Sequence, residues 1–234
     1  MPPSLKLPRQ RCQRCARPLS HCLCEHVRGV SNRTHVLILQ HPDEARHPLN
    51  TARLALLGLQ HAELWVGESF PQLGARLGEA NRSLLLFPDA KEAPSPGAQS
   101  PDLHRPPSPD LQEAPLLGMQ EAPSSDQQPD AELQDILLIV PDGTWRKAGR
   151  IVNANPALQC LPRLSLQAKQ PSGYIVRKAS KPHALSTVEA IVCALELLEP
   201  GQDFRALLAP FQALVQQQIK AMGPEVFRRN YAGK

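Results

Sequence analysis

Three short apolar runs constrain the fold of this chain more than any other feature. They have the length of β-strands and read THVLILQ at residues 34–40, SLLLFP at residues 83–88 and DILLIVP at residues 135–141. A strand with one solvated face alternates apolar and polar residues, whereas a continuous apolar run is typical of a strand in a parallel sheet covered on both faces. The three runs therefore predict a largely parallel sheet buried on both sides.

Helical patterns alternate with these runs, and HAELWVG at residues 61–67 supplies a further strand. In one pattern, Ser186 and Glu189 have the spacing of a capping box ahead of an apolar periodic run. The last pattern is an amphipathic helix with a kink expected at Pro210. This alternation predicts an α/β fold with helices on both faces of the sheet. The helical patterns begin near residues 48, 144, 186 and 203.

Residues 89–135 differ sharply from their flanks. They hold nine of the 25 prolines, no aromatic residue, no Ile and no Val, and they carry a net charge of −8. Such a segment buries too little apolar surface to offset its chain entropy, so we expect a disordered acidic insertion within one domain. The remaining residues carry +12, which suits a polyanionic partner such as nucleic acid, although a solvated basic surface explains the charge equally well.

Several classes of protein are disfavoured by the sequence. No apolar run approaches the roughly 20 residues that span a bilayer, and the N-terminus has no signal-peptide pattern, so we expect a cytoplasmic protein with no membrane partner. The sequence also has no glycine-rich dinucleotide fingerprint, no phosphate-binding loop and no nucleophile elbow.

Four cysteines lie within thirteen positions near the N-terminus. Cytoplasmic thiols at this spacing are typical of a structural zinc site, which takes four soft ligands in a closed tetrahedral shell. His21 and His26 are possible substitute ligands, and free thiols or a redox pair are the alternative. Residues 1–30 are thus predicted to form a small zinc-binding knuckle whose arginines present guanidinium groups to RNA. The predicted ligands are Cys12, Cys15, Cys22 and Cys24, while the isolated Cys160 and Cys193 are expected to be buried.

Polar motifs follow the predicted strands. In open α/β sheets the ligand site lies beyond the carboxyl ends of the strands. HPDE at residues 41–44 forms a loop after the first strand, PDGTW at residues 141–145 follows the third, and STVE at residues 186–189 begins a helix. Each motif alone is explained equally well as a helix cap, or, for Trp145, as a core aromatic, but together they predict one site.

The motifs as a set resemble a known family. The four-cysteine head, QHPDE, TAR at residues 51–53, PDGTW, SGYIVRK and STVEA are similar to those of the DTW-domain tRNA-uridine aminocarboxypropyltransferases. The resemblance implies a fold related to the SPOUT class, with a C-terminal knot that binds S-adenosylmethionine. It also implies a catalytic domain at residues 31–234, interrupted by the insertion at residues 89–135.

The implied reaction moves the 3-amino-3-carboxypropyl group of S-adenosylmethionine to N3 of a tRNA uridine and releases 5′-methylthioadenosine. A SPOUT-type RNA methyltransferase and a noncatalytic zinc-binding RNA adaptor are the rival hypotheses. The resemblance assigns Asp142 to the active centre, where it accepts the N3 proton, holds the imide or orients the cofactor's ammonium, with His41 as a second candidate base. The expected cofactor-binding residues are Glu44, Thr144, Trp145, Arg177, Ser186, Thr187 and Glu189.

Overall fold

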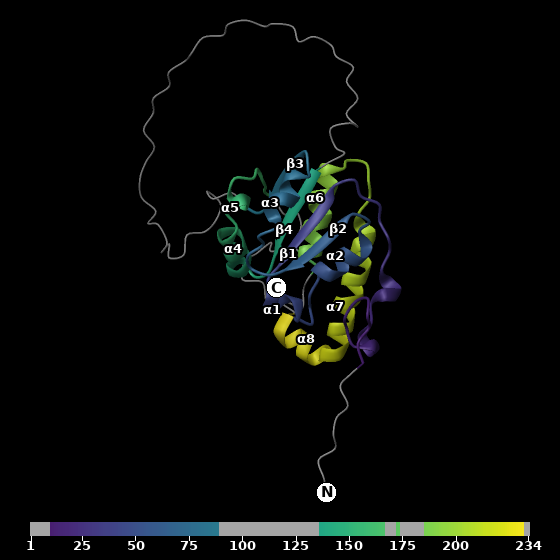
Figure 1. Cartoon of the computed structure of the whole chain (residues 1–234). Helices are drawn as coiled ribbons and strands as arrows, with labels where there is room; N and C mark the ends of the chain where they lie inside the picture. Colours follow the sequence, from purple (N-terminus) through teal and green to yellow (C-terminus); the bar gives the residue numbers. More distant parts are fainter. Residues whose placement is uncertain (1–9, 89–135, 167–171, 174–184, 232–234) are drawn as a thin grey trace, which may run out of the picture.

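A computed structural model describes residues 10–88, 136–166, 172–173 and 185–231 of the chain (Figure 1). Its centre is a five-stranded sheet in the order β2-β1-β4-β3-β5, in which every neighbouring pair is parallel. The strand predictions made from the apolar runs are confirmed. The strands are β1 (His35–Gln40), β2 (Ala62–Val66), β3 (Arg82–Leu86), β4 (Ile136–Asp142) and β5 (Arg163–Leu164).

Helices cover both faces of the sheet, as the alternation of patterns predicts. Figure 1 shows α4 and α5 on one side of the strands and α2 and α7 on the other. The α-helices are α1 (Pro42–Ala45), α2 (Ala52–Gly58), α3 (Leu73–Gly78), α4 (Trp145–Ala154), α5 (Pro156–Gln159), α6 (Thr187–Leu198), α7 (Ala209–Met222) and α8 (Pro224–Tyr231). Short 3₁₀ helices are η1 (Leu19–His21), η2 (Cys24–His26) and η3 (Arg205–Leu208).

The two faces of the sheet bury two separate apolar clusters. Alternate residues of a strand point to opposite faces, so Ile38 and Val140 pack with α2, α6 and α7, whereas Leu39 and Ile139 pack with α3 and α4. The same alternation carries on to the strand ends. Asp142 therefore lies on the α6 side of the sheet.

Two local expectations are wrong. The HPDE segment is not a loop, because residues 42–45 form the short helix α1 with His41 as its N-cap. Pro210 does not kink the last amphipathic helix but lies in the first turn of α7, after the separate helix η3. A proline has no N–H to donate and its fixed φ suits a helix start, so the chain begins a new helix there.

Some expectations fall outside the described residues. These are the acidic insertion at residues 89–135 and Arg177. The described residues do not establish the expected C-terminal knot. In the described ranges, no helix is both long enough and apolar enough to cross a membrane.

Candidate functional site

Asp142 is the last residue of β4 and its side chain is held from two elements. It pairs in register with Gln40 at the end of β1, and Gln40 Nε2 donates to Asp142 Oδ2 over 2.6 Å. The hydroxyl of Thr187, in the first turn of α6, donates to Asp142 Oδ1. Asp142 is only 6% exposed and Gln40 only 2%. The carboxylate is therefore fixed in position where β1, β4 and α6 meet.

The first turn of α6 contains the predicted capping box. Ser186 Oγ accepts from the backbone N–H of Glu189, and Glu189 Oε2 accepts from the backbone N–H of Ser186 at 2.7 Å. The Glu189 carboxylate also accepts from Ser172 Oγ at 2.6 Å and from the backbone N–H of Gly173 at 2.7 Å. With the Ser186 hydroxyl as a fourth donor, Glu189 anchors residues 172–173 to the start of α6.

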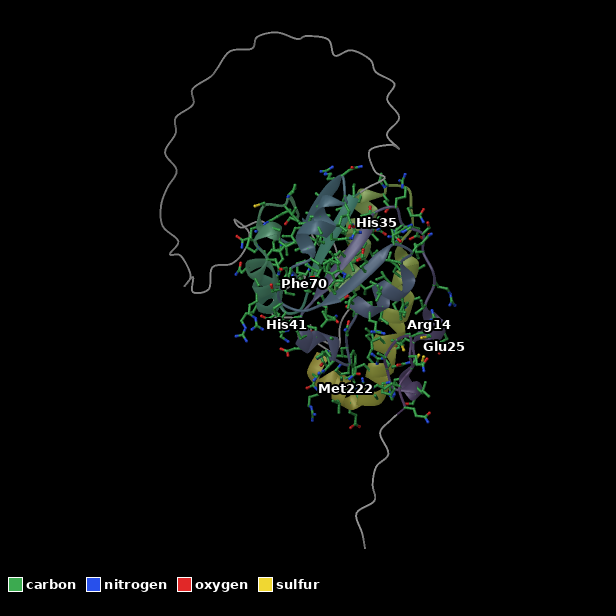
Figure 2. All side chains as sticks on the ribbon, in the orientation of Figure 1. Arg14, Glu25, His35, His41, Phe70 and Met222 are labelled. Carbon is green, nitrogen blue, oxygen red and sulfur yellow. The ribbon has the colours of Figure 1, made fainter. Side chains whose placement is uncertain are left out.

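His41 lies on the other side of the sheet edge. Figure 2 shows His35 and His41 at opposite ends of β1, so that His41 marks the carboxyl edge. Its Nδ1 accepts from the backbone N–H of Asp43 at 3.2 Å, and its Nε2 lies 2.6 Å from Glu68 Oε1. Arg150 Nη2 lies 2.7 Å from the same Nε2, so this nitrogen either donates to Glu68 or accepts from Arg150, according to the tautomer of the ring. Both ring nitrogens are thus engaged within the protein, and the residue is only 3% exposed.

Glu44 is also engaged in an internal contact. Its Oε1 lies 3.0 Å from Lys147 Nζ, and Asp43 Oδ2 lies 3.3 Å from the same ammonium. The hydrogen bond to Glu44, together with the charges of both carboxylates, raises the pKa of Lys147 above its ordinary value. The pair joins α1 to α4 and neutralises the carboxylate that the resemblance assigns to the cofactor.

Thr144 and Trp145 begin α4. The Thr144 hydroxyl caps the helix by accepting from the backbone N–H of Lys147 at 3.4 Å. Trp145 is 45% exposed, so the core alternative for this residue is wrong. Its ring meets Phe87 edge-on, with centroids 6.0 Å apart at 62°.

The three motifs do meet at the carboxyl edge, but the plane of the sheet divides them into two groups. Asp142, Ser186, Thr187 and Glu189 lie on the α6 side. The other group lies on the α4 side and consists of His41, Glu44, Thr144 and Trp145. A backbone hydrogen bond of 3.0 Å from His41 N to Asp142 O links the groups.

The motifs missed the residues that hold these groups in place. Gln40 could have been found from its sequence position, because it is a polar residue that directly follows the apolar run at residues 36–39. No local pattern singles out the others, and they reach their partners only in the fold. They are Glu68, Lys147 and Arg150.

The four thiols of the N-terminal knuckle converge as predicted. Cys12 Sγ lies 3.6 Å from Cys24 Sγ, Cys15 Sγ lies 3.8 Å from Cys22 Sγ, and all four sulfurs lie within 4.8 Å of one another. Zinc–sulfur bonds of about 2.3 Å in a tetrahedron place the sulfurs about 3.8 Å apart, so the cluster fits a zinc ion. Four thiolates fill the shell and leave no position for a reacting water.

The pKa values of the thiols differ within the cluster. Backbone N–H groups of Cys15 and Arg14 lower the pKa of Cys12 to about 6, whereas burial raises the pKa of Cys24 to about 12. A bound cation favours the thiolate form of all its ligands. Elsewhere in the chain the expectation of buried thiols is wrong for Cys160, which is exposed at the end of α5, while Cys193 is partly buried.

The knuckle packs on the body of the protein. Leu23 is fully buried in the apolar cluster on the α6 side of the sheet. Arg53, from the TAR motif, donates from Nε to the backbone oxygen of Arg14 at 3.0 Å, and Arg17 Nε donates to that of His21 at 3.0 Å. Arg17 and Arg53 therefore bind backbone within the protein, while Arg11 and Arg14 are exposed.

A parallel α/β sheet with a cluster of fixed polar side chains at its carboxyl edge has the architecture of a ligand-binding α/β domain. The chain belongs to the DTW-domain family, whose model matches residues 9–219. No solved structure matches it significantly.

Three relatives carry closely related names. The chain is 28% identical to tRNA-uridine aminocarboxypropyltransferase 2 of Drosophila melanogaster, over 90% of this chain and 76% of that protein. It is 28% identical to the protein of the same name in Mus musculus, of which it spans 64%. It is 26% identical to tRNA-uridine aminocarboxypropyltransferase A of Arabidopsis thaliana, over 92% of this chain and 83% of that protein.

Proposed function

We propose that this protein transfers the 3-amino-3-carboxypropyl group of S-adenosylmethionine to N3 of a uridine in tRNA and releases 5′-methylthioadenosine. The observation that carries the proposal is the meeting of the PDGTW, HPDE and STVEA motifs around the buried Asp142, in a chain of the DTW-domain family. The names of the relatives describe the transfer of an aminocarboxypropyl group to a tRNA uridine, which supports the proposal. The proposed fold is SPOUT-like, with its knot in the C-terminal half.

The α6 side of the carboxyl edge fits the cofactor's amino-acid portion. S-adenosylmethionine, when bound, supplies a carbon that its sulfonium makes electrophilic. The Asp142 carboxylate would pair with the cofactor's ammonium. Hydrogen bonds from Gln40 and Thr187 orient this carboxylate. Arg177 would pair with a carboxylate in a bidentate fork. Thr187 and Ser186 would flank the transferred group.

Orientation is the main demand of this chemistry, since the leaving group is already activated. In the alternative to binding the cofactor's ammonium, Asp142 would hold the uracil imide or accept its N3 proton at the same fixed place. His41 would serve as a positioning residue, because its two nitrogens are engaged by Asp43 and Glu68. Glu44 and Glu189 would likewise position α1 and residues 172–173 rather than touch the cofactor.

The proposed domain organisation has two parts. Residues 1–30 would form a zinc-binding head, and residues 31–234 a catalytic domain that contains the insertion at residues 89–135. Because its four thiolates fill the coordination shell, the zinc would be structural. Its role would be to hold the knuckle in a fixed shape, with Arg11 and Arg14 exposed to solvent.

The test uses purified protein, unmodified tRNA and S-adenosylmethionine labelled in the aminocarboxypropyl chain. We expect labelled uridine in the digested tRNA and an equal amount of 5′-methylthioadenosine. Asp142→Asn should lower the single-turnover rate at least about a hundredfold, the scale of a lost acid/base group, and remain folded. Methylated tRNA with S-adenosylhomocysteine would establish the methyltransferase instead, and tRNA binding without cofactor binding would establish the adaptor.

A further inference from the structure

The side chain of Trp145 is exposed at the carboxyl edge of the sheet. It is 45% exposed, yet its ring is held by the edge of Phe87 at a centroid distance of 6.0 Å. Phe87 is itself covered by Arg163, whose guanidinium carbon lies 5.6 Å from the ring centroid. An exposed tryptophan ring that packs against a neighbouring aromatic offers a large flat surface. Such surfaces stack unpaired nucleobases.

Arg146 and Arg150 lie one turn apart on the exposed surface of α4. Like charges at this spacing destabilise a helix. Arg150 Nη2 is compensated by Glu68 Oε1 at 3.5 Å. Among the described residues, by contrast, Arg146 makes no ion pair. Arg146 follows Trp145 in the first turn of α4, so both side chains are exposed at the same end of this helix.

In the part of the chain that the structure describes, the acidic side chains around the start of α4 are paired with other cations. Asp43 and Glu44 are both paired with Lys147, and Glu68 is paired with Arg150 and His41. The surface around the start of α4 is therefore an aromatic ring with one uncompensated arginine. That combination matches the two parts of a nucleotide, a flat base and an anionic phosphate.

We propose that this surface binds one unstacked nucleotide of the tRNA, with its base on Trp145 and a phosphate on Arg146. The inference rests on the proposed function and locates the RNA on the α4 side of the sheet edge.

The division of the site supports the tRNA, rather than the cofactor's adenine, as the source of this nucleotide. Asp142 and Thr187 lie on the α6 side, and Trp145 with Phe87 on the α4 side. A displacement in line requires the nucleophile and the leaving group on opposite sides of the reacting carbon. RNA that enters over α4 and cofactor that enters beside α6 meet this requirement across the sheet edge.

The test measures the affinities for tRNA and for S-adenosylmethionine separately, with tRNA binding followed over a salt series. The variants are Trp145→Ala, Trp145→Phe and Arg146→Glu. Arg205→Glu is the matched charge reversal, because Arg205 is exposed in η3, beyond the other end of α6. Thermal melting checks that each variant is folded.

We expect Trp145→Ala to weaken tRNA binding about tenfold, the scale of one lost base stack, while Trp145→Phe retains most of the affinity. Arg146→Glu should weaken tRNA binding. It should also make the slope of log affinity against log salt concentration shallower by about 0.7–0.9, as expected for one phosphate contact. Arg205→Glu should change neither quantity.

A loss of S-adenosylmethionine affinity in Trp145→Ala, with tRNA affinity unchanged, would assign the ring to the cofactor's adenine and overturn the proposal. Equal effects of Arg146→Glu and Arg205→Glu would overturn the phosphate contact. Because these are binding measurements, they remain decisive even if the wild-type protein transfers no group to tRNA, which would be a failure of the proposed function alone.

Discussion

Lys147 Nζ lies 3.0 Å from Glu44 Oε1, and this ion pair joins the first turn of α4 to α1. The Glu44 side chain is 11% exposed and that of Lys147 is 21% exposed. Removal of one partner from such a pair leaves a poorly solvated charge behind. The pair therefore ties the PDGTW motif to the HPDE motif through side chains, in addition to the backbone bond between His41 and Asp142.

Lys147→Met should lower the free energy of unfolding by about 1–3 kcal/mol, because Glu44 loses its partner while mostly buried. Urea unfolding of the purified protein measures this. Lys220→Met is the control, since Lys220 is exposed on α7. A loss of the same size in both variants, or none in Lys147→Met, would show that the pair contributes nothing specific.

The contribution of Lys147 should also depend on pH. Glu44 and Asp43 raise its pKa above the ordinary value of 10.5, so the folded protein binds this proton more tightly than the unfolded chain. The added stability is fully present below the unfolded pKa and is lost as pH rises through the folded pKa. The difference in unfolding free energy between wild type and Lys147→Met should thus stay constant from about pH 7 to 9 and shrink above about pH 10.5. A difference that grows at high pH would contradict this assignment.

Glu189→Gln should destabilise the protein by more than Ser186→Ala does. Loss of an N-cap hydroxyl costs about 1 kcal/mol, whereas a neutral amide at residue 189 weakens the interactions with four donors that a carboxylate accepts. Gly173→Ala is the steric control, because an added Cβ would lie 3.6 Å from Glu189 and 3.7 Å from Phe211, which are ordinary contacts. Chemical denaturation that ranks Glu189→Gln equal to Gly173→Ala would refute the anchoring role.

The knuckle should carry about one zinc per chain. Cys12→Ser and Cys22→Ser should each lower the metal content and the melting temperature, because a structural zinc couples to folding and Leu23 of this segment lies in the main core. Cys160→Ser removes an exposed thiol outside the cluster and should change neither. Metal analysis and thermal melting measure these effects, and a folded wild-type protein without metal would show that the knuckle binds no structural zinc.

Much of the fold could be predicted because its signals are local. Buried parallel strands show as continuous apolar runs, and the Ser186–Glu189 capping box fixes the start of α6 within one turn. The helix α1 escaped prediction because its four residues are too few to show a period, and His41 caps it with a ring nitrogen instead of the usual hydroxyl or carboxylate.

The site was predicted less completely for a different reason. Strand-end motifs identify which residues gather at the carboxyl edge, but the face to which each side chain points depends on its place in the alternation of the strand. A backbone hydrogen bond joins His41 to Asp142, yet the two side chains lie on opposite faces of the sheet. Partners such as Glu68 and Arg150 come from segments without a motif, so only the fold brings them to His41.

Residues 89–135 carry a net charge of −8, and this charge can be tested without changing the length of the segment. β3 ends at the carboxyl edge and its parallel neighbour β4 begins at the amino edge, so a large deletion between them would change the length available to join these ends as well as the charge. Replacement of the nine acidic residues between positions 89 and 132 by Asn or Gln keeps the length and removes nine negative charges.

If the segment competes with RNA for the basic surface, the neutralised variant should bind tRNA more tightly at low salt, and the gain should fade as salt screens both interactions. A variant with the same composition in shuffled order is the matched control and should bind like wild type, because a competing polyanion acts through its charge and not its order. Single-turnover rates at saturating tRNA should be equal in all three proteins. Weaker binding by the neutralised variant, or a lost rate in the shuffled one, would mean that the acidic residues contact the substrate or the active site directly.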